Sequence, residues 1–124
     1  AGWLRVLNGN RYSLRIPIDR ESTETMERFV GHYPHGLDLY LTPESGVSEL
    51  HLSVAVDNEN RYFARGLSLR PTLVSRFLEK VDLRYDPRRP APLETRLESG
   101  DIIRIGTDTH RAELEFIMLP KEER

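Results

Sequence analysis

Short runs in which apolar and polar residues alternate recur along most of the chain. Leu4 and Val6 form one such run, and Leu14, Ile16 and Ile18 form the next. An Asn-Gly turn at residues 8–10 separates them. Two alternating runs joined by this turn predict a β-hairpin.

Further strands follow the same pattern. Leu50, Leu52, Val54 and Val56 share one face of an expected strand, residues 57–60 form a turn, and residues 61–64 return as a second hairpin. Residues 29–30, 37–41, 102–105 and 112–119 are further expected strands. The polar stretch at 19–28 predicts a loop or one helical turn.

Residues 72–86 allow two interpretations. Leu73, Phe77, Leu78 and Val81 have helical spacing, whereas residues 81, 83 and 85 alternate as in a strand. Near residues 73–92 we therefore expect either a short helix or an extra hairpin. Prolines at 87, 90 and 92 then predict an extended, exposed loop, whose Arg-Arg pair at 88–89 could dock a partner or simply be solvated.

Many short strands without alternating helices predict an all-β protein, a sandwich or a barrel. With 124 residues the chain suits one domain, at residues 1–119, followed by a charged tail at 120–124. The absence of cysteine fits a reducing compartment and favours a cytoplasmic location. A net charge of −2 argues against broad nucleic-acid binding, and no apolar run is long enough to span a membrane.

Three short motifs recur in a fixed order between Val30 and Ile105: Gly31-His32, the Gly-Val-Ser-Glu-Leu-His stretch at 46–51, and Gly-Asp followed by Ile-Ile-Arg-Ile at 100–105. In this order and spacing they resemble a forkhead-associated (FHA) domain, and the resemblance implies a β-sandwich of two antiparallel sheets that binds phosphothreonine peptides. It covers residues 3–119, with an insertion between Ser75 and Leu93. It implies a divergent member whose phosphate-binding positions are altered.

The resemblance implies a first set of site residues. Gly31 corresponds to a glycine that an arginine usually follows, and His32 stands in the place of that arginine. Ser48 corresponds to the serine that donates to the phosphate, and His51 to the histidine that braces the loop. Each also has a structural interpretation, since His32 could be a solvated loop residue and Ser48 could cap a turn.

At a second set of candidate site residues the sequence departs from the family pattern or retains only part of that pattern. Glu49 occupies a position that is often basic, and its carboxylate would repel a phosphate. Arg70 stands where an asparagine usually bonds the peptide backbone, and an arginine supplies donors only. Thr72 is retained, and Arg65 could add positive charge at the rim or be a solvated surface residue.

Three functions remain open at this stage. The first is a non-enzymatic protein-interaction module within a larger protein, with phosphate dependence weakened or lost. The second is a genuine phosphothreonine reader in signalling. The third is an enzyme or metal site built on some of the four histidines. We expect no cofactor, metal, nucleic acid or membrane insertion, because the sequence holds no phosphate-binding glycine loop and no catalytic motif.

Overall fold

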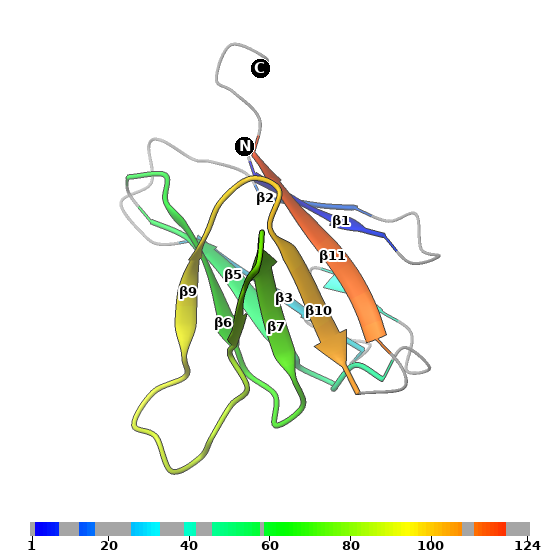
Figure 1. The fold of residues 1–124 in the computed structure, drawn as a ribbon, viewed down its shortest axis with the longest axis vertical. Coiled ribbons are helices and arrows are strands. Elements are labelled where there is room, and N and C mark those ends of the chain that lie inside the picture. Colours follow the sequence, from blue (N-terminus) through cyan, green and yellow to red (C-terminus); the bar gives the residue numbers. More distant parts are fainter. Residues whose placement is uncertain are drawn as a thin grey trace.

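The computed structural model describes residues 2–7, 13–16, 26–32, 39–41, 46–57, 59–107 and 111–118. Within these ranges the chain is all β, with the strands arranged in two sheets (Figure 1). The expected all-β sandwich of two sheets is confirmed. None of the described residues forms a helix, so none forms one that could cross a membrane.

The first sheet has six strands in the order β2-β1-β11-β10-β7-β8. Their bounds are β1 Gly2–Val6, β2 Ser13–Ile16, β7 Thr72–Arg76, β8 Glu79–Asp82, β10 Ile102–Gly106 and β11 Arg111–Met118. All neighbouring pairs in this sheet are antiparallel. The pairing of β1 with β2 confirms the first predicted hairpin, although its turn lies outside the described residues.

The second sheet has five strands in the order β4-β3-β5-β6-β9. Their bounds are β3 Met26–Gly31, β4 Leu39–Tyr40, β5 Leu52–Val56, β6 Tyr62–Gly66 and β9 Glu94–Leu97. The β5–β6 pair confirms the second predicted hairpin, and only the short β4 runs parallel to its described neighbour. Strand β5 begins at Leu52, so Leu50 lies before it and is exposed.

The ambiguity at residues 72–86 resolves into a hairpin, formed by β7 and β8. Phe77 lies at its tip with a φ of 53°, a left-handed conformation that a helix could not continue through. The helical spacing in this segment is therefore coincidental. Phe77 and Leu78 are both almost fully exposed at the tip.

Apolar side chains from both sheets fill the space between the layers. The ring centroids of Tyr62, from the second sheet, and Phe116, from the first, lie 5.1 Å apart. Alternation in β6 and β11 produces this inward-facing set, since Tyr62, Ala64, Leu114 and Phe116 are all buried. Burial of such a layer is the main stabilising contribution to the fold.

Candidate functional site

Three connections meet at one end of the sandwich. Strands β3, β6 and β8 end there, and β5, β7 and β9 begin there, so residues 46–51, 67–71 and 83–93 approach one another (Figure 1). Backbone hydrogen bonds join these segments. The N–H of Leu67 donates to the carbonyl of His51 at 2.9 Å, and the N–H of Tyr85 donates to the carbonyl of Ser68 at 2.8 Å.

A pocket of about 540 Å³ opens between the first two of these segments. It is lined by His32, Ser48, Glu49, Leu50, Leu67, Ser68, Leu69 and Arg70. Four candidates from the sequence, at positions 32, 48, 49 and 70, therefore meet around one concave surface. A polar pocket at the loop end of a rigid sandwich is a typical place for a binding site.

Ser48 lies in a short chain of hydrogen bonds within this pocket. The hydroxyl oxygens of Ser48 and Ser68 are 2.5 Å apart, and the backbone N–H of Arg70 donates to the Ser68 oxygen at 2.9 Å. With the Ser68 hydroxyl donating to Ser48, the Ser48 hydroxyl is left to donate to a ligand. Ser68 is nearly fully buried and Ser48 is partly exposed, so Ser48 is the end of the chain that a ligand could reach.

Gly31 holds the β3 strand against the loop before β5. A Cβ atom at this position would lie 2.1 Å from the carbonyl oxygen of Glu49, which no side chain could tolerate. The close approach lets the N–H of His32 donate to the carbonyl of Ser48 at 3.1 Å. Gly31 therefore serves the backbone geometry and presents no side chain to a ligand.

The imidazole of His32 is tied to the loop. Its Nδ1 lies 2.5 Å from the carbonyl oxygen of Val47, and a carbonyl can only accept, so Nδ1 carries the proton. In the neutral ring, Nε2 is then an acceptor and cannot donate to an anion. His32 is a weak substitute for an arginine, whose donors are always available.

His51 lies behind the pocket with both ring nitrogens engaged. Nδ1 accepts from the N–H of Ser48 at 3.0 Å, and Nε2 donates to the carbonyl of Pro71 at 2.9 Å. The side chain is fully buried, and burial lowers its pKa from 6.5 to about 4, with the nearby charge of Arg70 adding to this and the bond to Pro71 opposing it. His51 is thus a neutral, buried side chain that links the loop before β5 to the loop before β7 through hydrogen bonds.

Two opposite charges share the rim. The guanidinium of Arg70 donates to the carbonyl of Gly46 at 2.7 Å, which keeps it over the pocket. Glu49 is exposed on the same rim. A ligand phosphate would therefore meet one attractive and one repulsive formal charge.

Two other candidates do not line this pocket. Arg65 lies on the face of β6 that points away from the core, where it pairs with Glu27 at 3.5 Å and Glu94 at 3.2 Å. Thr72 is fully buried, so its hydroxyl does not reach the pocket surface. The alternation of side chains along a strand explains both positions. Arg65 lies on the opposite face of β6 from the buried residues Tyr62 and Ala64, whereas Thr72 lies on the same face of β7 as the buried Val74.

Some lining residues were absent from the sequence-based set of site candidates. Ser68 is the most important of these lining residues, and its position two residues before Arg70 was the signal in the sequence that could have identified it. Leu50 and Leu69 are exposed leucines on the rim. Nothing in their residue type marks them as lining a pocket.

Metal binding gains no support in the described ranges. They contain no group of three or more His, Asp or Glu side chains that could hold an ion. His51 has no free ring nitrogen, because both make hydrogen bonds. His35 and His110 lie outside the described residues.

Comparisons with known proteins bear on the fold. No protein-family model and no curated protein sequence matches the chain. Among solved structures it is similar to the N-terminal FHA domain of Rad53p from S. cerevisiae in complex with a phosphothreonine peptide, with a TM-score of 0.74 and 16% identity over 98% of this chain and 96% of that one. An FHA domain of the CT664 protein from Chlamydia trachomatis matches with a TM-score of 0.63 and 20% identity, over 96% and 98% of the two chains.

An engineered FHA domain with a Myc-pTBD peptide is also similar. Its TM-score is 0.75 at 16% identity, with 97% of this chain and 92% of that chain covered. These matches extend over nearly the whole chain, and their identities are low. They therefore establish the fold and leave the binding properties of this chain to its own residues.

Proposed function

We propose that this chain, which has the fold of FHA domains, is a protein-interaction module that binds a peptide segment of a partner protein through the pocket around Ser48. Phosphothreonine strengthens the binding only modestly. The observation that carries the proposal is the hydrogen-bond chain that links the Arg70 N–H, the Ser68 hydroxyl and the Ser48 hydroxyl. When the Ser68 hydroxyl donates to Ser48, the Ser48 hydroxyl is free to donate to a ligand.

The modest phosphate dependence follows from the charges on the rim. A phosphate carries a charge near −2 at neutral pH and is held best by several charged donors. Here Arg70 supplies one guanidinium and Glu49 supplies an opposing carboxylate. The Nδ1 proton of His32 is directed at the carbonyl oxygen of Val47 and away from a ligand. The attraction and the repulsion largely offset each other.

The apolar part of the rim supports peptide binding that does not depend on phosphate. Leu50 is 44% exposed and Leu69 is 67% exposed, and both border the pocket. Exposed leucines beside an accessible hydroxyl can hold the side chains and backbone of an extended peptide.

A strict phosphothreonine reader is the second candidate, favoured by the same Ser48 hydroxyl and by the peptide bound to the similar Rad53p domain. An array of peptides synthesised with threonine and with phosphothreonine at one fixed position separates the two. If the proposal is right, the best-binding peptides should bind in both their threonine and their phosphothreonine forms. Exclusive binding of the phosphorylated forms would favour the strict reader, and an array without binding would contradict both.

A further inference from the structure

A second pocket lies beside the first and is built by the segment that joins β8 to β9. It has a volume of about 460 Å³ and is lined by Leu69, Asp82, Arg84, Tyr85, Asp86, Pro87, Arg88 and Arg89. Leu69 lines both pockets, so they share a wall. A peptide that extended from the first pocket across Leu69 would therefore reach the second.

Backbone hydrogen bonds fix this segment against the first pocket. The N–H of Leu83 donates to the carbonyl of Thr72 at 2.8 Å, and the N–H of Gly66 donates to the carbonyl of Leu93 at 3.2 Å. A Cβ on Gly66 would lie 1.7 Å from the Leu83 carbonyl oxygen, so the two backbones are in direct contact. Together with the bond from Tyr85 to Ser68, these contacts place the segment rigidly relative to Ser48.

The charges in the second pocket favour an anion. Asp86 is engaged by Arg88, whose Nε and Nη2 lie 3.1 and 3.0 Å from its two carboxylate oxygens. Asp82 accepts from the backbone N–H of Arg84 at 2.9 Å and pairs with its Nη2 at 3.2 Å. The charge of Arg89 also acts on Asp86, but among the described residues the Arg89 guanidinium forms no ion pair or side-chain hydrogen bond and so keeps its donors for a ligand. Arg84 is more than half exposed and retains further donors.

We propose that this second pocket binds an anionic group on the same partner peptide, through Arg84 and Arg89, with Tyr85 and Leu69 packing against the intervening peptide. This inference rests on the proposed peptide-binding function and adds what the partner must carry: a carboxylate or a second phosphate beside the segment held at Ser48. Guanidinium groups bind both kinds of anion through paired N–H donors.

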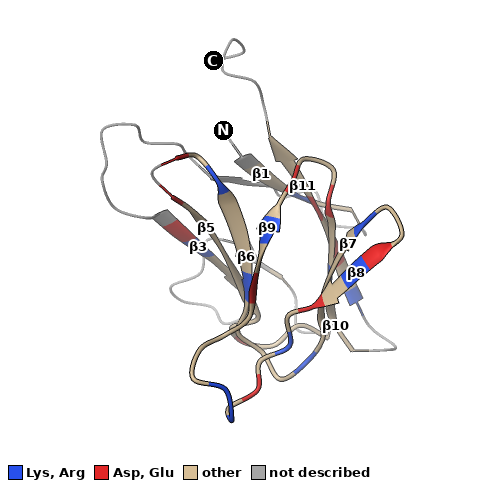
Figure 2. Cartoon of the chain, turned by 60° about the vertical axis from the view of Figure 1, so that its left-hand side comes forward, with Lys and Arg blue, Asp and Glu red and all other residues tan. Residues whose placement is uncertain are grey.

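The arrangement supplies the positive charge that the first pocket lacks. Figure 2 shows blue segments along the loop that joins β8 to β9, at the end of the sandwich where the pockets lie. The second pocket contains three arginines and two aspartates, whereas charges of opposite sign balance in the first. Selectivity for an acidic partner is therefore expected to depend on the β8–β9 segment.

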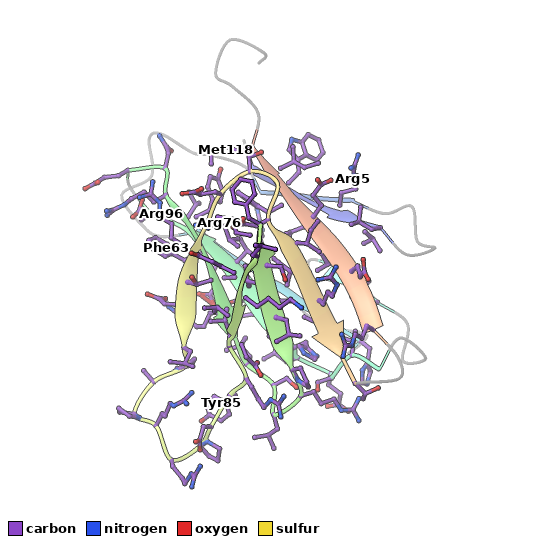
Figure 3. All side chains as sticks on the ribbon, in the orientation of Figure 1. Arg5, Phe63, Arg76, Tyr85, Arg96 and Met118 are labelled. Carbon is purple, nitrogen blue, oxygen red and sulfur yellow. The ribbon has the colours of Figure 1, made fainter. Side chains whose placement is uncertain are left out.

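The test uses three pools of fifteen-residue peptides with a central phosphothreonine and degenerate flanking positions. The first pool has neutral flanks only, the second admits Asp and Glu, and the third admits a second phosphothreonine. Binding of each pool is measured for the wild type, for the double variant Arg84→Gln/Arg89→Gln, and for the control Arg96→Gln. Arg96 is exposed on β9, and Figure 3 shows it toward the opposite end of the molecule from Tyr85.

The wild type should bind the second or third pool at least about fivefold more tightly than the first, as expected for one charge-assisted interaction at a partly exposed site. The double variant should bind all three pools equally, and Arg96→Gln should retain the preference. A larger gain in affinity for the second pool would identify the anion as a carboxylate, and a larger gain for the third would identify it as a phosphate. A preference that persists in the double variant, or is absent from the wild type, would overturn this inference while leaving the proposed function intact. Failure of every pool to bind the wild type would overturn both.

Discussion

Nε2 of His51 donates to the carbonyl oxygen of Pro71 at 2.9 Å and so ties the loop before β5 to the loop before β7. The same ring accepts the N–H of Ser48 through Nδ1, which requires a neutral imidazole. The pocket therefore depends on an uncharged, buried histidine behind its surface.

Protonation of His51 should destabilise the protein. Its pKa is about 4 in the folded state and 6.5 without burial, so the unfolded chain binds the extra proton first as pH falls. The stabilisation is fully present above pH 6.5 and is lost between pH 6.5 and 4, by about 3 kcal/mol. Urea denaturation at several pH values measures it. The free energy of unfolding of His51→Gln should lack this loss between pH 6.5 and 4. If the free energies of unfolding of the two proteins changed in parallel with pH, the account would be contradicted.

The close approach at Gly31 predicts a strong effect of a single methyl group. Gly31→Ala should lower the free energy of unfolding by at least about 2 kcal/mol, because the Glu49 carbonyl must move. Gly100→Ala is the control, since its Cβ meets open space and only its positive φ of 97° adds strain, of about 1 kcal/mol. Equal losses in denaturant titrations would show that crowding at Gly31 is unimportant.

Asp101 supports the turn before β10. It is almost fully buried, and Arg76 donates to its two carboxylate oxygens at 2.9 and 2.8 Å. Asp101→Asn should reduce the free energy of unfolding by about 2–4 kcal/mol, because it breaks a pair with one buried member. Glu115→Gln removes the exposed pair with Arg5 and should cost less than about 1 kcal/mol. A similar cost for both variants would contradict this assignment.

Much of the fold could be predicted because local signals decide it. The hairpins at β1–β2 and β5–β6 follow from alternation around a turn, and the Gly100-Asp101 turn precedes β10 as expected. The parallel pairing of β4 with β3 could not be predicted, since its partner is chosen by tertiary packing. The prediction of a loop or one helical turn at residues 19–28 is wrong for residues 26–28, which begin strand β3.

The candidate site was less predictable. His32, Ser48, Glu49 and Arg70 come together because the end of β3 and the connections at 46–51 and 67–71 meet at one end of the sandwich. The ion pairs that hold Arg65 away from the pocket join it to strands β3 and β9, and a sequence pattern does not reveal such contacts. The second pocket depends on the path of an irregular proline-containing segment, for which no periodicity exists.

Glu49 should weaken phosphopeptide binding. At about 6 Å a carboxylate repels a phosphate by about 1–1.4 kcal/mol at the dielectric constant of water, and salt reduces this repulsion. Glu49→Gln should therefore strengthen binding of a phosphothreonine peptide about five- to tenfold and leave binding of its threonine form unchanged. Glu59→Gln, in the turn between β5 and β6, is the matched control. Isothermal titration at low salt measures both, and an equal response of the two peptide forms to Glu49→Gln would contradict the electrostatic explanation.

The role of Ser48 is the central claim, and Ser48→Ala tests it most directly. Dissociation constants are measured for the wild type and the variant with the best peptide from the array, in its phosphorylated and unphosphorylated forms. The account predicts that the wild type prefers the phosphorylated form about tenfold or less and that the variant prefers neither form, because it lacks the hydroxyl donor. An unchanged preference in Ser48→Ala, or a wild-type preference above about a hundredfold, would contradict it.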